Sequence, residues 1–115
     1  MIFIIDDDQE MAECISLAIR SIKPAESIRI FSNAIAAMQV LDDEELPSLI
    51  FLDILLNGPD GFTFLNELSS YSDTAKIPVV IVSSLSLKKQ QLEDYGVVGF
   101  LDKTTMTPED IQKYV

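Results

Sequence analysis

Two short apolar segments of this chain end in acidic residues. Residues 2–5 (IFII) lead into residues 6–8 (DDD), and residues 49–52 (LIFL) lead into Asp53. Uninterrupted apolar runs of this length are typical of strands that a parallel sheet buries on both faces. Because parallel strands point the same way, we expect the acids to meet at one edge of the sheet.

Strands and helices are predicted to alternate along the whole chain. The first predicted strand ends near residue 6, and the other four cover residues 27–31, 48–53, 77–82 and 98–101. Helical spacing of apolar residues and helix start signals predict helices at about 9–22, 33–41, 62–69, 88–95 and from 108 onward. Five strands alternating with five helices predict a doubly wound α/β domain, with helices on both faces of a parallel sheet. Ligands of such folds bind beyond the carboxyl ends of the strands.

Polar residues predict where several helices begin. Asp8 can cap the first helix and Ser32 the second, because their side-chain oxygens can accept hydrogen bonds from free backbone N–H groups. Residues 107–110 (TPED) combine a capping threonine, a proline at the first helical position and acids in the first turn. This pattern is typical of a helix start.

The chain has one cysteine, Cys14, which lies at helical spacing with Met11, Ala18 and Ile22. We therefore expect it to be a small core residue and not a reactive thiol. A lone cysteine cannot form an internal disulfide, and the first residues lack the basic stretch of a secretory signal. No apolar segment approaches the roughly 20 residues of a membrane-spanning helix. These features indicate a cytoplasmic domain.

The chain is strongly acidic. Its 19 acidic and 8 basic residues give a formal net charge of −11. This charge opposes direct binding to nucleic acid or to an anionic membrane surface, and it favours a cation or a basic partner. The 115 residues, 48% of them hydrophobic, suffice for a single domain spanning 1–115 with one core, and leave no room for a second catalytic or DNA-binding domain.

The residues at the strand ends suggest phosphate chemistry. Asp6 and Asp7 follow the first predicted strand, Asp53 the third and Ser83 the fourth, and Lys103 comes just after the fifth. Clustered carboxylates repel one another, whereas a hard cation such as Mg²⁺ takes oxygen ligands and removes that repulsion. A metal and a lysine can neutralise phosphoryl oxygens while a carboxylate attacks phosphorus and a hydroxyl binds the product.

The order of four motifs resembles the receiver domain of two-component response regulators over essentially the whole chain. The motifs are Ile4-Ile5-Asp6-Asp7-Asp8, Leu52-Asp53-Ile54 with Gly61 eight residues after Asp53, Val82-Ser83-Ser84, and Gly99-Phe100-Leu101-Asp102-Lys103. Each motif alone is weak evidence, but four in this order are strong evidence. The resemblance implies the flavodoxin-like strand order 2-1-3-4-5.

The same resemblance implies a phosphoacceptor and a metal site. Asp53 would be the phosphoacceptor, and Asp7 and Asp53 would bind Mg²⁺ through their side chains. The backbone carbonyl of Leu55 would supply a further ligand, and Asp6 would act mainly through coordinated water. Mn²⁺ could substitute for Mg²⁺.

The resemblance also implies a switch. Lys103 would pair with the acceptor and then with the phosphate, Ser83 would bind the phosphoryl group, and Phe100 would change rotamer with it. The surface around the fourth helix, fifth strand and fifth helix would then repack. The phosphoryl donor would be a sensor histidine kinase or a histidine phosphotransfer protein, and an output domain or a second receiver would be a further partner. The domain would be a switch and not a turnover enzyme.

Two residues depart from the pattern of this family. The family commonly has proline after the lysine, often with a cis bond, but Thr104 follows Lys103 here, and a cis bond to a non-proline residue costs about 3 kcal/mol. Asn57 replaces the proline often found four residues after the acceptor. The last helix is also short for the family, as it would be if the helix were truncated and the native protein continued into an output domain; the sequence leaves both alternatives open.

Two other functions fit parts of the sequence. Asp6-x-Asp8, Ser83 and Lys103 resemble the catalytic set of haloacid-dehalogenase-type phosphatases, in which Asp6 would be the nucleophile. However, Asp53 would then have no role, and the chain is short for that superfamily. A degenerate receiver that acts as an interaction module without phosphorylation is the second alternative.

Overall fold

The computed structural model describes residues 1–43, 46–56, 60–84 and 95–115. Its elements are β1 (Ile2–Ile5), α1 (Gln9–Ile22), β2 (Ile28–Phe31), α2 (Ala34–Asp43), β3 (Leu49–Asp53), α3 (Gly61–Ser69), β4 (Val79–Ser83), β5 (Val97–Asp102) and α4 (Pro108–Gln112). The helix predicted at 88–95 lies almost entirely outside the described residues. Among the helices that are described, none is long and apolar enough to cross a membrane.

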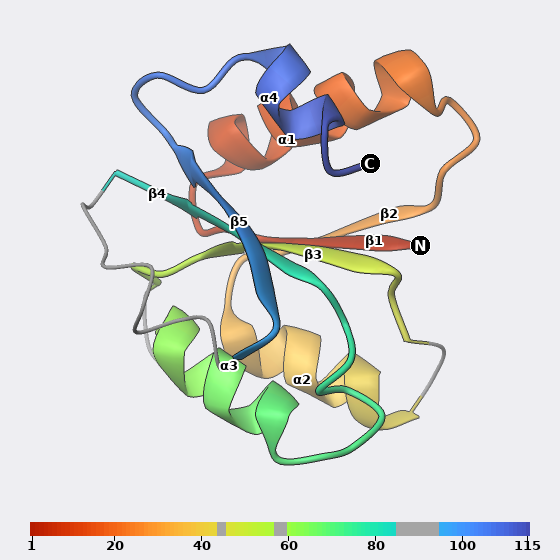
Figure 1. The fold of residues 1–115 in the computed structure, drawn as a ribbon, viewed down its shortest axis with the longest axis vertical. Helices are drawn as coiled ribbons and strands as arrows, with labels where there is room; N and C mark the ends of the chain where they lie inside the picture. Colours follow the sequence, from red (N-terminus) through yellow and green to blue (C-terminus); the bar gives the residue numbers. More distant parts are fainter. Residues whose placement is uncertain (44–45, 57–59, 85–94) are drawn as a thin grey trace.

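The five strands form one parallel sheet in the order β2-β1-β3-β4-β5. Helices α1 and α4 cover one face of the sheet, and α2 and α3 cover the other (Figure 1). The doubly wound fold and its strand order are therefore confirmed. The order reverses between β1 and β3, which is the point where ligands of such sheets bind.

The central strands are fully buried. Every residue of β1, β3 and β4 is buried, as expected for apolar runs covered by helices on both faces. The edge strands β2 and β5 contain exposed positions. The three fully buried strands therefore form the centre of the sheet. Among them, β1 and β3, the two strands that lead into acids, are neighbours.

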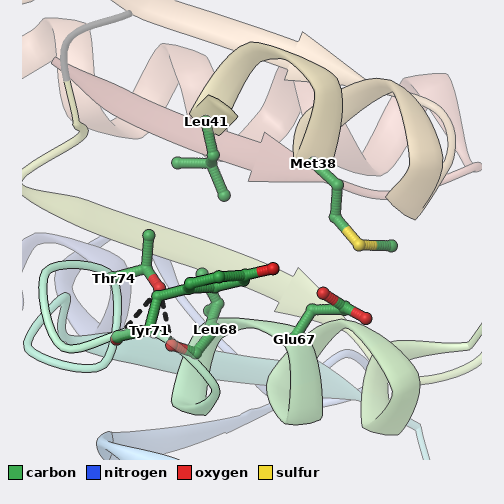
Figure 2. A pocket seen from close by; sticks show the side chains of 6 residues that line it. All are labelled: Met38, Leu41, Glu67, Leu68, Tyr71 and Thr74. Carbon is green, nitrogen blue, oxygen red and sulfur yellow. Dashed lines mark hydrogen bonds between the residues drawn. The ribbon is translucent and has the colours of Figure 1, made fainter. Parts of the chain in front are cut away.

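Helices α2 and α3 leave a pocket of about 240 Å³ between them (Figure 2). It is lined by Met38, Leu41, Glu67, Leu68, Tyr71 and Thr74. The Thr74 hydroxyl is hydrogen-bonded to the carbonyl oxygens of Leu68 (2.6 Å) and Tyr71 (3.3 Å), which stabilises the turn between α3 and β4. The pocket therefore lies near the start of β4, at the end of the sheet opposite the acids.

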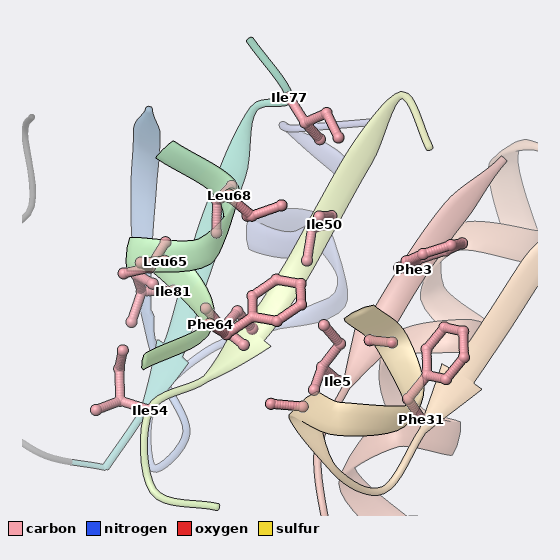
Figure 3. Close-up of a cluster of buried hydrophobic side chains, with 14 residues drawn as sticks. Phe3, Ile5, Phe31, Ile50, Ile54, Phe64, Leu65, Leu68, Ile77 and Ile81 are labelled. Atoms are coloured by element: carbon pink, nitrogen blue, oxygen red, sulfur yellow. The ribbon is translucent and has the colours of Figure 1, made fainter. Parts of the chain in front are cut away.

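A cluster of buried apolar side chains joins the sheet to α2 and α3 (Figure 3). The Phe3 and Phe31 rings meet edge to face, with their centroids 4.8 Å apart. Phe64 and Leu65 of α3 are fully buried against the sheet. Because burying one such side chain contributes roughly 1.5–3 kcal/mol, this cluster holds the start of α3 close to the end of β3.

A second buried cluster lies on the face of the sheet covered by α1 and α4, where Ile15 and Ile111 are among its members. The Gln112 side-chain nitrogen donates hydrogen bonds to the Ala18 carbonyl (3.0 Å) and the Ser21 hydroxyl (2.7 Å). These bonds hold α4 directly against α1.

The predicted core face of α1 is partly wrong. Ala18 is buried as expected, but Cys14 is exposed, and Ile22 is 47% exposed. The buried stripe consists of Ala12, Ile15, Ala18 and Ile19. Neighbouring helix positions are about 100° apart, so a stripe centred on Ile15 turns Cys14 toward solvent.

Two of the three predicted helix caps are confirmed. The Asp8 carboxylate caps α1, and Thr107 forms a capping box with Asp110 at the start of α4. At α2 the prediction is wrong, because the oxygen accepting from the third helical N–H (2.9 Å) belongs to Asn33 and not to Ser32. Asparagine is as good a cap as serine, so α2 begins one residue later than expected.

Strand β5 contains a bulge. Val97 pairs with the first residue of β4, but Gly99 pairs with the second, so Val98 is an extra residue. Val98 is 55% exposed. Beyond the bulge, Phe100 packs against the same apolar cluster as Val97, on the face covered by α2 and α3.

Gly61 allows α3 to begin directly beside the end of β3. Its backbone nitrogen donates a hydrogen bond to the Ile54 carbonyl (2.9 Å). A Cβ atom at this position would lie 2.7 Å from both the Asp53 carbonyl oxygen and the Ile54 Cα. These are backbone atoms of the segment that carries the buried acid, so they cannot move aside without displacing it.

We predict that Gly61→Ala lowers the free energy of unfolding by about 1–3 kcal/mol, the usual cost of overpacking, although alanine favours a helix more than glycine does. Urea denaturation monitored by circular dichroism measures this change. Gly99→Ala is the matched control, because the atoms nearest its added methyl group belong to the Tyr114 ring, which can turn away. An equal or smaller loss in Gly61→Ala would contradict the argument.

Candidate functional site

The acids at the ends of β1 and β3 lie together, as predicted. Ile5 pairs with Leu52, so Asp6 and Asp53 follow at equivalent positions of neighbouring strands. Both acids are buried, and Asp7 is half-buried beside them. Each of the three offers a carboxylate oxygen, and these oxygens all lie within 4.8 Å of one another.

Lys103 joins the two buried acids. Its ammonium nitrogen lies 3.0 Å from Asp53 Oδ2 and 3.1 Å from Asp6 Oδ2. The side chain of Lys103 is 17% exposed, compared with 1% for Asp6 and 5% for Asp53. The lysine therefore brings a positive charge from the segment after β5 to the ends of β1 and β3.

Backbone N–H groups bind one oxygen of each buried acid. Asp6 Oδ1 accepts a hydrogen bond from the Asp8 nitrogen (2.9 Å), and Asp53 Oδ1 accepts one from the Leu55 nitrogen (3.2 Å). Asp6 Oδ2, in contrast, has no hydrogen-bond partner among the described residues. The lysine is close to this oxygen but makes its hydrogen bond to Asp6 Oδ1 (3.4 Å).

Burial changes the proton affinity of two groups in the site. It raises the pKa of Asp6, and the nearby charge of Asp53 raises it further, although bonds from Asp8 and Lys103 act in the opposite direction. Burial alone would lower the pKa of Lys103, but its hydrogen bonds and charge interactions with Asp53 and Asp6 outweigh that effect and raise it. The lysine is thus held in its charged form between the acids.

This acidic cluster could hold a divalent metal ion. The Oδ2 atom of Asp6 is buried without a hydrogen bond in the described part of the chain, and the pKa of Asp6 is raised. A bound cation would stabilise the ionised form of this acid. Carboxylate oxygens are the ligands that hard cations such as Mg²⁺ prefer. Leu55 lies in the segment directly after Asp53, and the role of its carbonyl remains a prediction.

Ser83 and Phe100 lie on β4 and β5, the two strands that follow β3 in the sheet. Ser83 is buried at the carboxyl end of β4, and its carbonyl accepts a hydrogen bond from the Lys103 nitrogen (3.1 Å). Phe100 is half-buried and pairs with Ile81. Ser83 therefore shares one end of the sheet with the acids and Lys103, and the switching roles of Ser83 and Phe100 remain predictions. Asn57 lies outside the described residues.

A turn after β5 was not predicted from the sequence. The Asp102 carboxylate accepts hydrogen bonds from both the nitrogen (2.8 Å) and the hydroxyl (2.6 Å) of Thr104. These two bonds lower the pKa of Asp102. The Lys103–Thr104 peptide bond is trans. The signal for this turn is an aspartate two residues before a donor, which is typical of an Asx turn.

Comparison with known proteins supports the family resemblance. A profile of the response regulator receiver domain matches residues 2–115. Among characterised proteins, Response regulator PleD of Caulobacter vibrioides is 34% identical over 61 residues, which are 51% of this chain and 13% of PleD. The chain therefore corresponds to a small part of that relative's length.

Solved structures share the fold. A two-component response regulator from Legionella pneumophila has a TM-score of 0.84 and 24% identity, covering 97% of this chain and 92% of the other. The phosphorylated cyanobacterial phytochrome response regulator RcpA has a TM-score of 0.79 and 23% identity, with coverage of 97% and 86%. The Mn²⁺-bound form of response regulator Rcp1 has a TM-score of 0.72 and 21% identity, with coverage of 97% and 86%.

The profile match extends over almost the entire chain, and the sheet order agrees with the resemblance seen in the four motifs. The match leaves no part of the chain for a haloacid-dehalogenase-type domain with Asp6 as nucleophile. The chain belongs to the response regulator receiver domain family, whose members take part in two-component signalling.

Proposed function

We propose that this receiver domain is a phosphorylation-dependent switch in which Asp53 accepts a phosphoryl group with the help of Mg²⁺. The observation that carries this proposal is the contact of the Lys103 ammonium with Asp53 Oδ2 at 3.0 Å, beside two further acids. A surface aspartate that only solubilises the domain would be neither buried nor paired in this way.

The proposed reaction transfers a phosphoryl group between nitrogen and oxygen. An Asp53 carboxylate oxygen attacks phosphorus, the phosphorus–nitrogen bond to the donor's phosphohistidine breaks, and the imidazole leaves with the bonding electrons. The product is an acyl phosphate on Asp53. Lys103 is placed to neutralise the negative charge on the transferred oxygens, which is the main contribution that a protein makes to phosphoryl transfer.

Asp6, Asp7, Asp53 and the Leu55 carbonyl would hold the metal ion. When bound, the cation supplies positive charge that offsets repulsion among these acids and the incoming phosphoryl oxygens. Asp6 Oδ2, which is buried and accepts no hydrogen bond from the described residues, supports a bound cation here. The Mn²⁺-bound form of Rcp1, a structure with the same fold, supports Mn²⁺ as a substitute.

Phosphorylation of Asp53 would be read out through Ser83 and Phe100. The modification adds negative charge and three acceptor oxygens to a buried site. We infer that the Ser83 hydroxyl moves to bind these oxygens and that Phe100, half-buried on β5, changes rotamer. The surface formed by the predicted helix at 88–95, β5 and α4 would repack and change its affinity for a partner.

A sensor histidine kinase or a histidine phosphotransfer protein would be the donor, and an output domain or a second receiver would respond to the switch. The domain would release its phosphate slowly and would not act as a turnover enzyme. The competing proposal is a degenerate receiver that binds partners without phosphorylation. The intact set of Asp7, Asp53 and Lys103 favours the phosphorylated switch.

Phosphorylation at Asp53 gives the first prediction. Incubation with phosphoramidate or acetyl phosphate and Mg²⁺ should add one phosphoryl group to the wild-type protein, and intact-protein mass spectrometry detects it. Asp53→Asn should remain unmodified, because an amide does not form an acyl phosphate. Asp8→Asn is the matched control and should be modified like the wild type, because Asp8 caps α1. Absence of modification with both these donors and a phosphohistidine donor would favour the degenerate receiver.

Metal binding gives the second prediction. Mg²⁺ should raise the melting temperature of the wild-type protein, because a ligand that binds the folded state stabilises it by about 2.7 kcal/mol at one hundred times its Kd. Asp7→Asn should lose most of this increase, whereas Asp8→Asn should keep it. Differential scanning fluorimetry over a range of Mg²⁺ concentrations measures the effect, and equal responses of the two variants would contradict the assigned ligands.

The raised pKa of Asp6 gives the third prediction. Between the ordinary pKa of 3.8 and the raised value, the folded state binds more protons than the unfolded state, so stability falls as pH rises through this window. Asp6→Asn removes this cost and should raise the free energy of unfolding in metal-free buffer at neutral pH.

This gain should shrink as the pH falls toward 4, because the wild-type acid is then protonated. Urea denaturation at several pH values measures it. Asp8→Asn, which makes the same change of charge at an exposed cap, should show no such pH-dependent gain. A loss of stability in Asp6→Asn at neutral pH would show that its ion pair with Lys103 outweighs the cost of burial.

A further inference from the structure

The segment after β5 is held in one conformation by Asp102. The Asp102 carboxylate accepts two hydrogen bonds from Thr104, and its backbone carbonyl accepts from the nitrogens of Thr105 (3.1 Å) and Met106 (2.8 Å). One residue thus accepts four hydrogen bonds from the three residues 104–106. Glycine and proline, which commonly stabilise turns, are absent from this segment.

Lys103 lies inside this turn. Its backbone nitrogen donates a hydrogen bond to the Ser83 carbonyl, which holds Lys103 against β4. The next residue, Thr104, is held by its hydrogen bonds to Asp102. Its side chain then extends to Asp53 and Asp6. A lysine side chain is long and flexible, so the position of its ammonium group depends on how firmly its backbone is held.

We propose that Asp102 is a positioning residue for phosphotransfer, which holds the Lys103 ammonium between Asp53 and Asp6 by fixing the backbone of residues 102–106 through Thr104. This inference rests on the proposed function. Asp102 is exposed and lies at the end of β5, and it acts on the reaction through Lys103 and not by contact with the phosphoryl group.

The role differs from general stabilisation of the fold. Both donors to the Asp102 carboxylate belong to Thr104, two residues along the chain, so the interaction is local. The acids of the metal cluster lie on other segments, after β1 and at the end of β3. Loss of the Asp102 carboxylate should therefore affect the lysine and leave Mg²⁺ binding unchanged.

The first test measures the position of Lys103 without any phosphorylation. Acetic anhydride labels free amines, and peptide mass spectrometry reports the rate at each lysine. Asp102→Ala should increase labelling of Lys103 severalfold relative to Lys113, whose side chain is 73% exposed. Asp102→Asn keeps the accepting oxygen and loses the charge, so it should retain wild-type labelling. Unchanged labelling in Asp102→Ala would overturn the proposal, whether or not the domain is phosphorylated.

The second test measures the rate of phosphorylation by phosphoramidate at saturating Mg²⁺. Asp102→Ala should lower the rate at saturating donor by about tenfold, because small displacements of a catalytic group cost rates of this order, while Mg²⁺ affinity stays constant. Asp102→Asn should restore the rate. In a Lys103→Ala background, Asp102→Ala should cause no further loss, because the two residues act through one contact.

If Asp102→Ala lowered the phosphorylation rate by the same factor in the Lys103→Ala background as in the wild-type protein, the proposal would be overturned. Asp102 would then act independently of the lysine. Failure of the wild-type protein to accept any phosphoryl group would instead overturn the proposed function, and the labelling test would still decide whether Asp102 positions Lys103. Thr104→Val, which removes the hydroxyl donor but keeps the backbone donor, should give intermediate labelling and an intermediate rate.

Discussion

The rest of the site depends on one ammonium group placed between two buried carboxylates. Ionised carboxylates are costly to bury unless they are paired, and the parallel sheet forces Asp6 and Asp53 together at its central strands. Lys103, which lies in the segment after β5, reduces this cost by pairing with both acids. It thereby joins that segment to the ends of β1 and β3. Asp6 Oδ2 lies 3.1 Å from the lysine but accepts no hydrogen bond from the described residues, so the lysine alone does not satisfy the cluster.

Much of the fold could be predicted because the relevant signals are local. The apolar runs of β1, β3 and β4 are continuous, and each strand is buried over its whole length. Parallel strands that end in acids place Asp6 and Asp53 at the same end of the sheet, which could be expected from the sequence. Their closeness also requires that β1 and β3 are neighbours. The order itself came from the resemblance to receiver domains and was confirmed by the pairing of the strands.

The errors and omissions arise where local signals are ambiguous. Cys14 and Ile15 both fit a helical apolar stripe, and the rotation of α1 on the sheet decides which one is buried. Ser32 and Asn33 are both good caps, and the start of α2 decides between them. The turn at Asp102 was missed because the expectation at this position concerned a proline, whereas the observed geometry comes from a side-chain acceptor.

The bulge in β5 has a consequence for changes in chain length. Side chains alternate between the faces of a strand, so deleting one residue normally exchanges the faces of everything on one side of the deletion. Val98 is the extra residue of the bulge, and Val97 and Gly99 already pack on opposite faces of the sheet. Val97 and Val98 are identical residues, so deleting either one gives the same chain. This deletion would remove the bulge while Phe100 stays on the side of α2 and α3 and Leu101 stays on the side of α1 and α4.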